Sequence, residues 1–345
     1  MSPQFVDFNA DGHVDILTAT FDGSPHISFG SKEGFGKPEH ILDSKGERIL
    51  ISSFWNYKDH QHQETGRALG VETPPKERCI SALAFDWDAD GDYDLLLGGY
   101  EKGHLYRQMN EGTNAEPRFT GKNIAVMAGD APFGIEAKMT SPRLVDWDGD
   151  GDMDIIAGSF GDVWGQGPGG GVFLYRNTGT RGKPVFAAAE TLIPVSLKGK
   201  ALPTRPDAGL YVDAADYDGD GDLDLVVGGY SMWTPEGPEL SAAQQDRAKQ
   251  LAAKKGALQK ESLELSRAIN REILAVTKGM ERGSKELRLK AAEIRATHSK
   301  KTRNLSKSIR AVSQELESLV PAPKRKSFVW LYERKQVRPG NDSRN

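Results

Sequence analysis

Four stretches of the chain place a polar, aspartate-rich segment directly before a short apolar run. They are DFNADGHVDILTATF (residues 7–21), DWDADGDYDLLLGGY (86–100), DWDGDGDMDIIAGSF (146–160) and DYDGDGDLDLVVGGY (216–230). Short apolar runs bounded by aspartate and glycine predict β-strands rather than helices. A further apolar stretch follows, as in HLYRQMN (104–110) and GVFLYRN (171–177). Each copy therefore predicts a strand, an acidic loop, a second strand, a turn, a third strand and, after a Gly/Pro turn, a fourth.

The copies recur at intervals that fit one repeated structural unit. Their first aspartates, Asp7, Asp86, Asp146 and Asp216, are 79, 60 and 70 residues apart. Four antiparallel strands in a repeat of this length are typical of a β-propeller blade. We therefore predict an all-β fold, a β-propeller of about four blades, with units near residues 3–43, 79–127, 139–195 and 209–237.

Residues 238–326 interrupt the fourth unit with a helical pattern. Apolar residues follow alternating steps of three and four, which predicts two helices that pack as a coiled coil. The first arm carries Leu251, Leu258, Leu265, Ile269, Val276 and Met280, and the second carries Leu287, Ala291, Ile294, Leu305, Ile309, Val312, Leu316 and Leu319. The sequence GMERGS (279–284) supplies a turn between them, and FVWLYERK (328–335) resembles GVFLYRN. We expect an antiparallel α-helical hairpin inserted in the last blade, followed by a returning strand and tail at 327–345.

The acidic loops share the pattern DxDxDGxxD, whose residues we number as positions 1 to 9. Side chains at positions 1, 3, 5 and 9 can converge, because glycine at position 6 permits a sharp turn. Hard oxygen ligands in this number suit Ca²⁺, with the carbonyl of position 7 as a further ligand. Neighbouring carboxylates without a cation repel by about 1–4 kcal/mol per pair. An EF-hand would need a Glu at position 12, where this chain has Thr18, Leu97, Ala157 and Val227.

These loops and their flanking strands resemble the FG-GAP/VCBS repeat family, calcium-loop β-propellers similar to the integrin α-subunit head. The resemblance covers residues 3–235 and 327–335. It implies up to four Ca²⁺ ions, with backbone carbonyl ligands from His13, Asp92, Asp152 and Asp222. The side-chain ligands that it implies are Asp7, Asn9, Asp11, Asp15, Asp86, Asp88, Asp90, Asp94, Asp146, Asp148, Asp150, Asp154, Asp216, Asp218, Asp220 and Asp224. Two arrangements remain open: a small, loosely closed propeller, or a chain that forms part of a longer product.

Aromatic residues gather in the non-repeating loops, which antiparallel connectivity places at the face opposite the acidic loops. Trp55, Tyr57, Trp164 and Trp233 lie in these segments. Exposed aromatic side chains offer flat apolar area to a protein or carbohydrate ligand, so we predict a recognition surface there. The alternative is that the tryptophans fill the top of the propeller.

Charge divides the chain into two parts of opposite sign. Residues 1–237 hold 37 acidic against 20 basic side chains, whereas residues 238–326 hold 10 against 21. The basic segment raises nucleic acid or anionic lipid as partners. Its Lys and Arg are interleaved with Glu and lack stacking aromatics, so we expect no nucleic acid and favour self-association or a partner helix.

The predicted function is that of a binding or scaffold module rather than an enzyme. The chain has no G-x-S-x-G, H-E-x-x-H or P-loop pattern, the usual signatures of several catalytic sites. The alternative is a propeller enzyme, a lyase or hydrolase that acts on polysaccharide. No signal peptide and no apolar run long enough to span a bilayer are legible, and Cys79 is the single cysteine. Family members are mostly exported, so the resemblance implies an extracytoplasmic location, secreted, periplasmic or at the cell surface.

Overall fold

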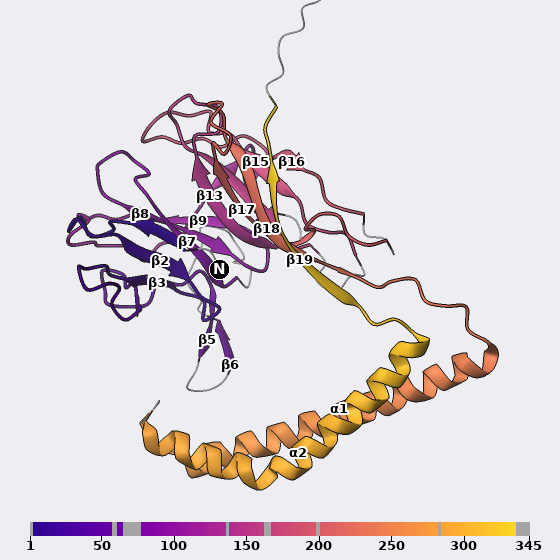
Figure 1. The fold of residues 1–345 in the computed structure, drawn as a ribbon. Coiled ribbons are helices and arrows are strands. Elements are labelled where there is room, and N and C mark those ends of the chain that lie inside the picture. Colours follow the sequence, from indigo (N-terminus) through magenta and orange to yellow (C-terminus); the bar gives the residue numbers. More distant parts are fainter. Residues whose placement is uncertain are drawn as a thin grey trace, which may run out of the picture. The chain divides into compact units, whose positions relative to one another are not determined.

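The computed structural model describes residues 3–56, 61–64, 77–135, 138–161, 167–197, 201–281 and 284–335. The chain divides into two compact units. The first comprises Met1–Trp233 and Arg325–Asn345, and the second comprises Thr234–Lys324. The first unit contains antiparallel β-sheets and the second contains two helices (Figure 1).

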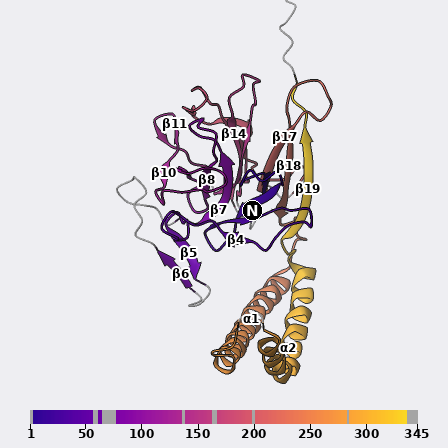
Figure 2. The same ribbon diagram turned by 90° about the vertical axis from the view of Figure 1, so that its left-hand side faces the viewer.

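Three four-stranded antiparallel sheets and one three-stranded sheet form the first unit. Sheet 1 is β1 (Gln4–Val6), β2 (Asp15–Ala19), β3 (Pro25–Ser28) and β4 (Glu39–His40). Sheet 2 is β7 (Cys79–Phe85), β8 (Asp94–Gly99), β9 (Leu105–Gln108) and β10 (Ile124–Ala125). Sheet 3 is β13 (Met139–Val145), β14 (Asp154–Ser159), β15 (Val172–Tyr175) and β16 (Glu190–Ile193). Sheet 4 is β17 (Ala208–Ala215), β18 (Asp224–Trp233) and β19 (Lys324–Tyr332) (Figure 2).

Strands in each sheet follow one another as neighbours, as the repeats predict. Two short hairpins lie between the sheets in sequence: β5 (Ser53–Asn56) with β6 (Gln61–Glu64), and β11 (Met127–Ala128) with β12 (Ala131–Pro132). The predicted antiparallel β-rich fold is therefore confirmed. Sheet 4 has no fourth strand among the described residues.

The sheets pack face to face, and three apolar clusters fill the spaces between successive sheets. Leu95 and Leu97 of β8 enter the cluster shared with sheet 1, whereas Leu96 enters the cluster shared with sheet 3. The third cluster joins sheets 3 and 4, for example through Ile156 and Val212. Every residue of β8 and β14 is buried, which explains why these strands are continuously apolar rather than alternating.

The second unit is an antiparallel hairpin of α1 (Ala242–Val276) and α2 (Lys285–Leu319) (Figure 1). Ser241 and Gln244 form a capping box at the start of α1, and Ser284 caps α2, so unpaired N–H groups at both helix starts gain acceptors. The buried residues of the two helices are Ala248, Leu251, Ala291, Ile294, Leu305 and Val312. No helix among the described residues is long and apolar enough to cross a membrane.

One predicted position of the helical seam is wrong. Val276 is 46% exposed, whereas Thr277 is buried and Ile273 is partly buried. Val276 is the last residue of α1, and Thr277 is its C-cap. Ile273 and Thr277 are four residues apart, so the inward face at the end of the helix passes through them and leaves Val276 beside it.

Candidate metal centres in the acidic loops

Each acidic loop connects the first and second strands of its sheet, so all four occupy equivalent places. The loops are residues 7–15, 86–94, 146–154 and 216–224. Their backbones turn through the left-handed region twice, once at position 4 and once at position 6. The residues are Ala10, Ala89, Gly149 and Gly219 at position 4, and Gly12, Gly91, Gly151 and Gly221 at position 6.

Position 6 requires glycine because of its backbone conformation, not because a side chain would lack space. The φ angles there are 87°, 98°, 93° and 94°, and a Cβ atom would meet nothing within 4 Å. Residues with a side chain rarely adopt this conformation. The turn folds the loop back on itself and gathers the carboxylates of positions 1, 3 and 5.

Three of the four loops bring three carboxylates together. In each triad, one oxygen of every carboxylate lies within 4.8 Å of the others. The triads are Asp86, Asp88 and Asp90; Asp146, Asp148 and Asp150; and Asp216, Asp218 and Asp220. Positions 1, 3 and 5 of these loops therefore converge as the sequence predicts. Oxygen ligands so arranged are compatible with a calcium ion.

Unpaired oxygens in the loops favour a bound cation. Asp86 Oδ1, Asp92 Oδ1 and Asp222 Oδ1 are buried without a hydrogen-bond partner among the described residues. Such atoms are costly unless a ligand or water contacts them. Two of them belong to position 7, for which the resemblance implies only a backbone carbonyl. The side chains of Asp92 and Asp222 are therefore additional candidate ligands.

Burial and the crowding of carboxylates raise the pKa values of aspartates in the second and fourth loops. Burial raises the pKa of Asp92 to about 6, and repulsion from Asp90, Asp88 and Asp86 adds to the effect. Burial likewise raises the pKa of Asp94 to about 6. In the fourth loop, burial and repulsion from Asp220 raise the pKa of Asp222. Without a cation, these carboxylates hold protons more tightly than ordinary aspartates do.

The aspartates at position 9 have a second role that the sequence does not predict. Asp15, Asp94, Asp154 and Asp224 are buried, and each bridges two segments of its own repeat. Their Oδ2 atoms accept hydrogen bonds from the N–H groups of position 2: Phe8, Trp87, Trp147 and Tyr217, at 2.9, 3.0, 3.2 and 3.1 Å. Their Oδ1 atoms accept from N–H groups just beyond the third strand: Gly30, Asn110, Asn177 and Arg334, at 2.7, 2.7, 2.7 and 2.8 Å. These carboxylates tie the loop to the third strand, and their predicted role as metal ligands remains a prediction.

The first loop differs from the others in how its charge is compensated. Asn9 Nδ2 donates to Asp11 Oδ2 at 3.1 Å, and the His13 N–H donates to Asp11 Oδ1 at 2.8 Å. The hydrogen bond from the His13 backbone, followed by that from Asn9, lowers the pKa of Asp11. Asp7 accepts from the N–H groups of Asp11 and Gly12. With two aspartates among positions 1, 3 and 5, this loop offers a cation less negative charge.

An arginine partly neutralises the third loop. Arg176 Nη1 lies 2.7 Å from Asp148 Oδ2, and its Nε lies 2.7 Å from Glu190 Oε1. Asp152, at position 7, donates its N–H to Asp150 Oδ1. A calcium ion in this loop would share Asp148 with the guanidinium group.

The structure describes two of the four aromatic residues that we predicted on the ligand-binding face, and these two lie in different surroundings. Trp55 lies in β5, with its ring 4.9 Å from that of His62. Trp233 lies at the end of β18 and lines a cleft of about 470 Å³ together with Leu202, Arg205 and Met232. Tyr57 and Trp164 lie outside the described residues.

A repeated aromatic position at the same end of the strands escaped the sequence prediction. Six residues after position 9, the four repeats carry Phe21, Tyr100, Phe160 and Tyr230. The Phe21 and Tyr100 rings lie 5.8 Å apart, and those of Tyr100 and Phe160 lie 5.6 Å apart. Three cations face these rings: Arg78 and Lys138 lie over Tyr100, and Arg325 lies over Tyr230. The sequence contains the information needed to predict this aromatic position, since each of the four acidic stretches ends in Phe or Tyr.

The fold and loops define a class: repeated antiparallel sheets, each with an acidic, cation-compatible loop between its first two strands. A family model for the FG-GAP-like repeat matches residues 86–157 and 146–227. Residues 86–227 of the chain are therefore similar to the FG-GAP-like repeat, in agreement with the resemblance inferred from the sequence over this part of the chain. No curated protein matches the chain.

Proposed function

We propose that the chain is a calcium-stabilised, propeller-like binding module. Ca²⁺ in the acidic loops would hold each first and second strand together, and the opposite ends of the strands would contact a ligand. The observation that carries this proposal is that acidic side chains and aromatic or cationic side chains lie at opposite ends of the sheets. Carboxylate triads stand at one end of the sheets, and aromatic rings, cations and the Trp233 cleft stand at the other.

The calcium part of the proposal rests on the ligand set. Carboxylates at positions 1, 3 and 5 are hard ligands, and Ca²⁺ takes six to eight oxygens in a flexible geometry. Unpaired buried oxygens of Asp86, Asp92 and Asp222 are available to such an ion. Calcium sites of extracellular modules have Kd values on the order of 10⁻⁴–10⁻³ M. Affinity in this range would keep the loops filled outside the cytoplasm, and we propose an extracytoplasmic location.

The ligand part of the proposal rests on the cleft. Trp233 offers a ring for apolar contact, and Arg205 in the same lining offers a charged donor. Aromatic rings beside a few polar groups are typical of ligand sites. A carbohydrate fits this combination, because sugar C–H groups cover an aromatic ring while hydroxyl or carboxylate groups accept hydrogen bonds. The helical hairpin as a surface for self-association or for a partner helix remains a prediction.

An array of neutral and uronate-containing oligosaccharides, probed with the full chain in millimolar Ca²⁺, tests the ligand site. We expect Trp233→Ala to weaken binding at least tenfold. Trp330→Ala is the matched control, because Trp330 is partly exposed on β19 and does not line the cleft. Equal binding by Trp233→Ala and the wild type would contradict the proposal. Cleavage of an acidic polysaccharide by the wild type would favour the enzymatic alternative.

A further inference from the structure

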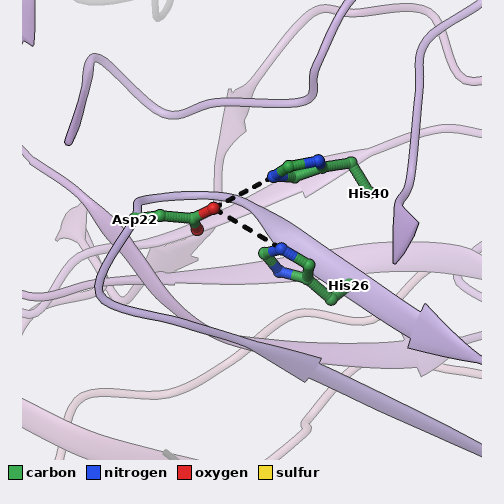
Figure 3. A group of neighbouring side chains, drawn as sticks. All are labelled: Asp22, His26 and His40. Carbon is green, nitrogen blue, oxygen red and sulfur yellow. Dashed lines mark hydrogen bonds and ion pairs between the residues drawn. The ribbon is translucent and has the colours of Figure 1, made fainter. Parts of the chain in front are cut away.

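A second group of metal-ligating side chains lies in sheet 1, in residues that the acidic loops do not include. Figure 3 shows Asp22, His26 and His40 pointing toward one another. Asp22 lies in the turn between β2 and β3, whereas His26 lies in β3 and His40 in β4. The two histidines are direct cross-strand partners. The backbone pairing of the sheet therefore sets the distance between the two imidazole rings.

The distances in this cluster match those around one metal ion. His40 Nε2 lies 3.0 Å from Asp22 Oδ2, and His26 Nε2 lies 3.4 Å from the same oxygen. The two ring centroids lie 4.3 Å apart. In a tetrahedral zinc site with bonds of about 2.0–2.1 Å, ligand atoms lie about 3.3 Å apart. All three candidate ligand atoms lie within 4.8 Å of one another, so side-chain movements would allow them to share one ion.

The proton position on His26 supports a cation between the ring and the carboxylate. His26 Nδ1 lies 3.1 Å from the Ser24 carbonyl oxygen. A carbonyl only accepts, so Nδ1 carries a proton, and in the neutral ring the Nε2 lone pair is directed at Asp22 Oδ2. A proton or a metal ion between these two atoms would make their contact favourable.

The carboxylate of Asp22 is held in place by partners on its other oxygen. Asp22 Oδ1 accepts from Thr20 Oγ1 at 2.7 Å and from the Ser24 N–H at 3.1 Å. Together with the Nδ1 contact of His26, these bonds resemble the outer partners that orient metal ligands. Oδ2 is the oxygen that faces both histidines.

Among the described residues, Arg48 competes with a metal for the Asp22 carboxylate. Its Nη2 lies 3.2 Å from Asp22 Oδ2. The guanidinium has other partners, since Nε donates to Ser24 Oγ at 3.1 Å and the group lies over the Phe54 ring. It can therefore release Oδ2 while keeping its place. A metal and Arg48 would share or exchange the same carboxylate oxygen.

We propose that Asp22, His26 and His40 form a binding site for a divalent transition metal of the zinc class. Imidazole nitrogen and carboxylate oxygen are ligands that zinc accepts, and water completes a set of three protein ligands. The His40 side chain is 36% exposed, so ions and water reach the site from solvent. The bound ion would join the β2–β3 turn to β3 and β4. This inference does not depend on the calcium loops or on the proposed ligand.

Titration of the full chain with Zn²⁺ and Co²⁺, in millimolar Ca²⁺ to fill the acidic loops, tests the site. We expect one Zn²⁺ per chain by calorimetry, and visible Co²⁺ absorption bands of a site with imidazole ligands. His26→Gln and His40→Gln should each weaken Zn²⁺ binding at least tenfold. His298→Gln, which changes a histidine paired with Glu272 in the helical hairpin, should bind like the wild type. Arg48→Met should bind Zn²⁺ several-fold more tightly.

Two results would overturn the proposal. One is a wild-type chain that binds no Zn²⁺ at 100 µM, a result that needs no variant and would mean that a proton fills the space. The other is unchanged Zn²⁺ binding in the His26→Gln/His40→Gln double variant. If His26→Gln fails to fold, two measurements still test the site. They are Zn²⁺ binding by His40→Gln, which changes the more exposed histidine, and the Co²⁺ spectrum of the wild type.

Discussion

Aspartates that are adjacent in sequence perform two different tasks in the acidic loops. Asp146, Asp148 and Asp150 form a carboxylate cluster whose mutual repulsion a cation would offset. Asp154, four residues beyond Asp150, is buried and has backbone N–H donors on both oxygens. The first group is compatible with a bound calcium ion, whereas the second makes hydrogen bonds that need no ion. Spacing alone does not separate these tasks, because all of these residues fit one ligand pattern.

Asp150→Asn and Asp154→Asn form a matched pair that separates the two roles. We expect Asp154→Asn to lower the free energy of unfolding by about 1–3 kcal/mol with and without calcium, because its new amide opposes a backbone donor. Asp150→Asn should reduce only the calcium-dependent part of the stability. Chemical unfolding with calcium and with chelator measures both effects. Equal losses for Asp154→Asn and Asp150→Asn in chelator would contradict this division.

The second loop predicts an unusual pH dependence for the calcium-free protein. Asp92 and Asp94 have folded pKa values of about 6, against 3.8 for an ordinary aspartate. Between these values the folded state binds more protons than the unfolded state, so the free energy of unfolding falls as pH rises. In calcium-depleted protein, the second loop should therefore contribute more to the free energy of unfolding at pH 5 than at pH 7. Comparison of the wild type with Asp92→Asn at both pH values isolates this contribution, and an identical pH dependence of the two proteins would contradict the assignment.

At the scale of elements, the aromatic residue at position 2 of an acidic loop packs between its own sheet and the next. Phe8 stacks near Tyr93 and Phe119 of the next repeat, and Trp87 contacts Phe186 of the repeat after it. Trp147 lies beneath the guanidinium of Arg334. Each of these rings therefore packs against the following repeat. Tyr217, the equivalent in sheet 4, is 69% exposed.

Trp87→Ala and Tyr217→Ala test this packing at equivalent positions. Trp87 is 8% exposed, and truncation of a buried tryptophan costs about 3–5 kcal/mol. Tyr217→Ala should change the free energy of unfolding by about 0.5 kcal/mol or less, as surface substitutions do. Chemical unfolding in saturating calcium compares the two variants. A large loss for Tyr217→Ala would show that the outer face of sheet 4 is covered in solution.

For the whole molecule, local patterns predict the elements well and the sites between them poorly. Apolar runs and the DxDxDGxxD spacing predict the strands and the triads, because both depend on neighbours in sequence. The Asp22, His26 and His40 cluster depends on the pairing of β3 with β4, and nothing in the local sequence marks that register. The cleft at Trp233 likewise joins residues 195–197 and 201–207 to the end of β18. Sites assembled by tertiary contacts need the fold before they can be recognised.

The central claim is that calcium holds the repeats together, and thermal unfolding of the full chain tests it most directly. With 5 mM Ca²⁺ and Kd values of 10⁻⁴–10⁻³ M, each site adds about 1–2 kcal/mol. Three or four sites should raise the unfolding temperature by on the order of 10 °C over chelator, and Mg²⁺ at the same concentration should raise it much less. The same unfolding temperature in calcium, magnesium and chelator would contradict the claim.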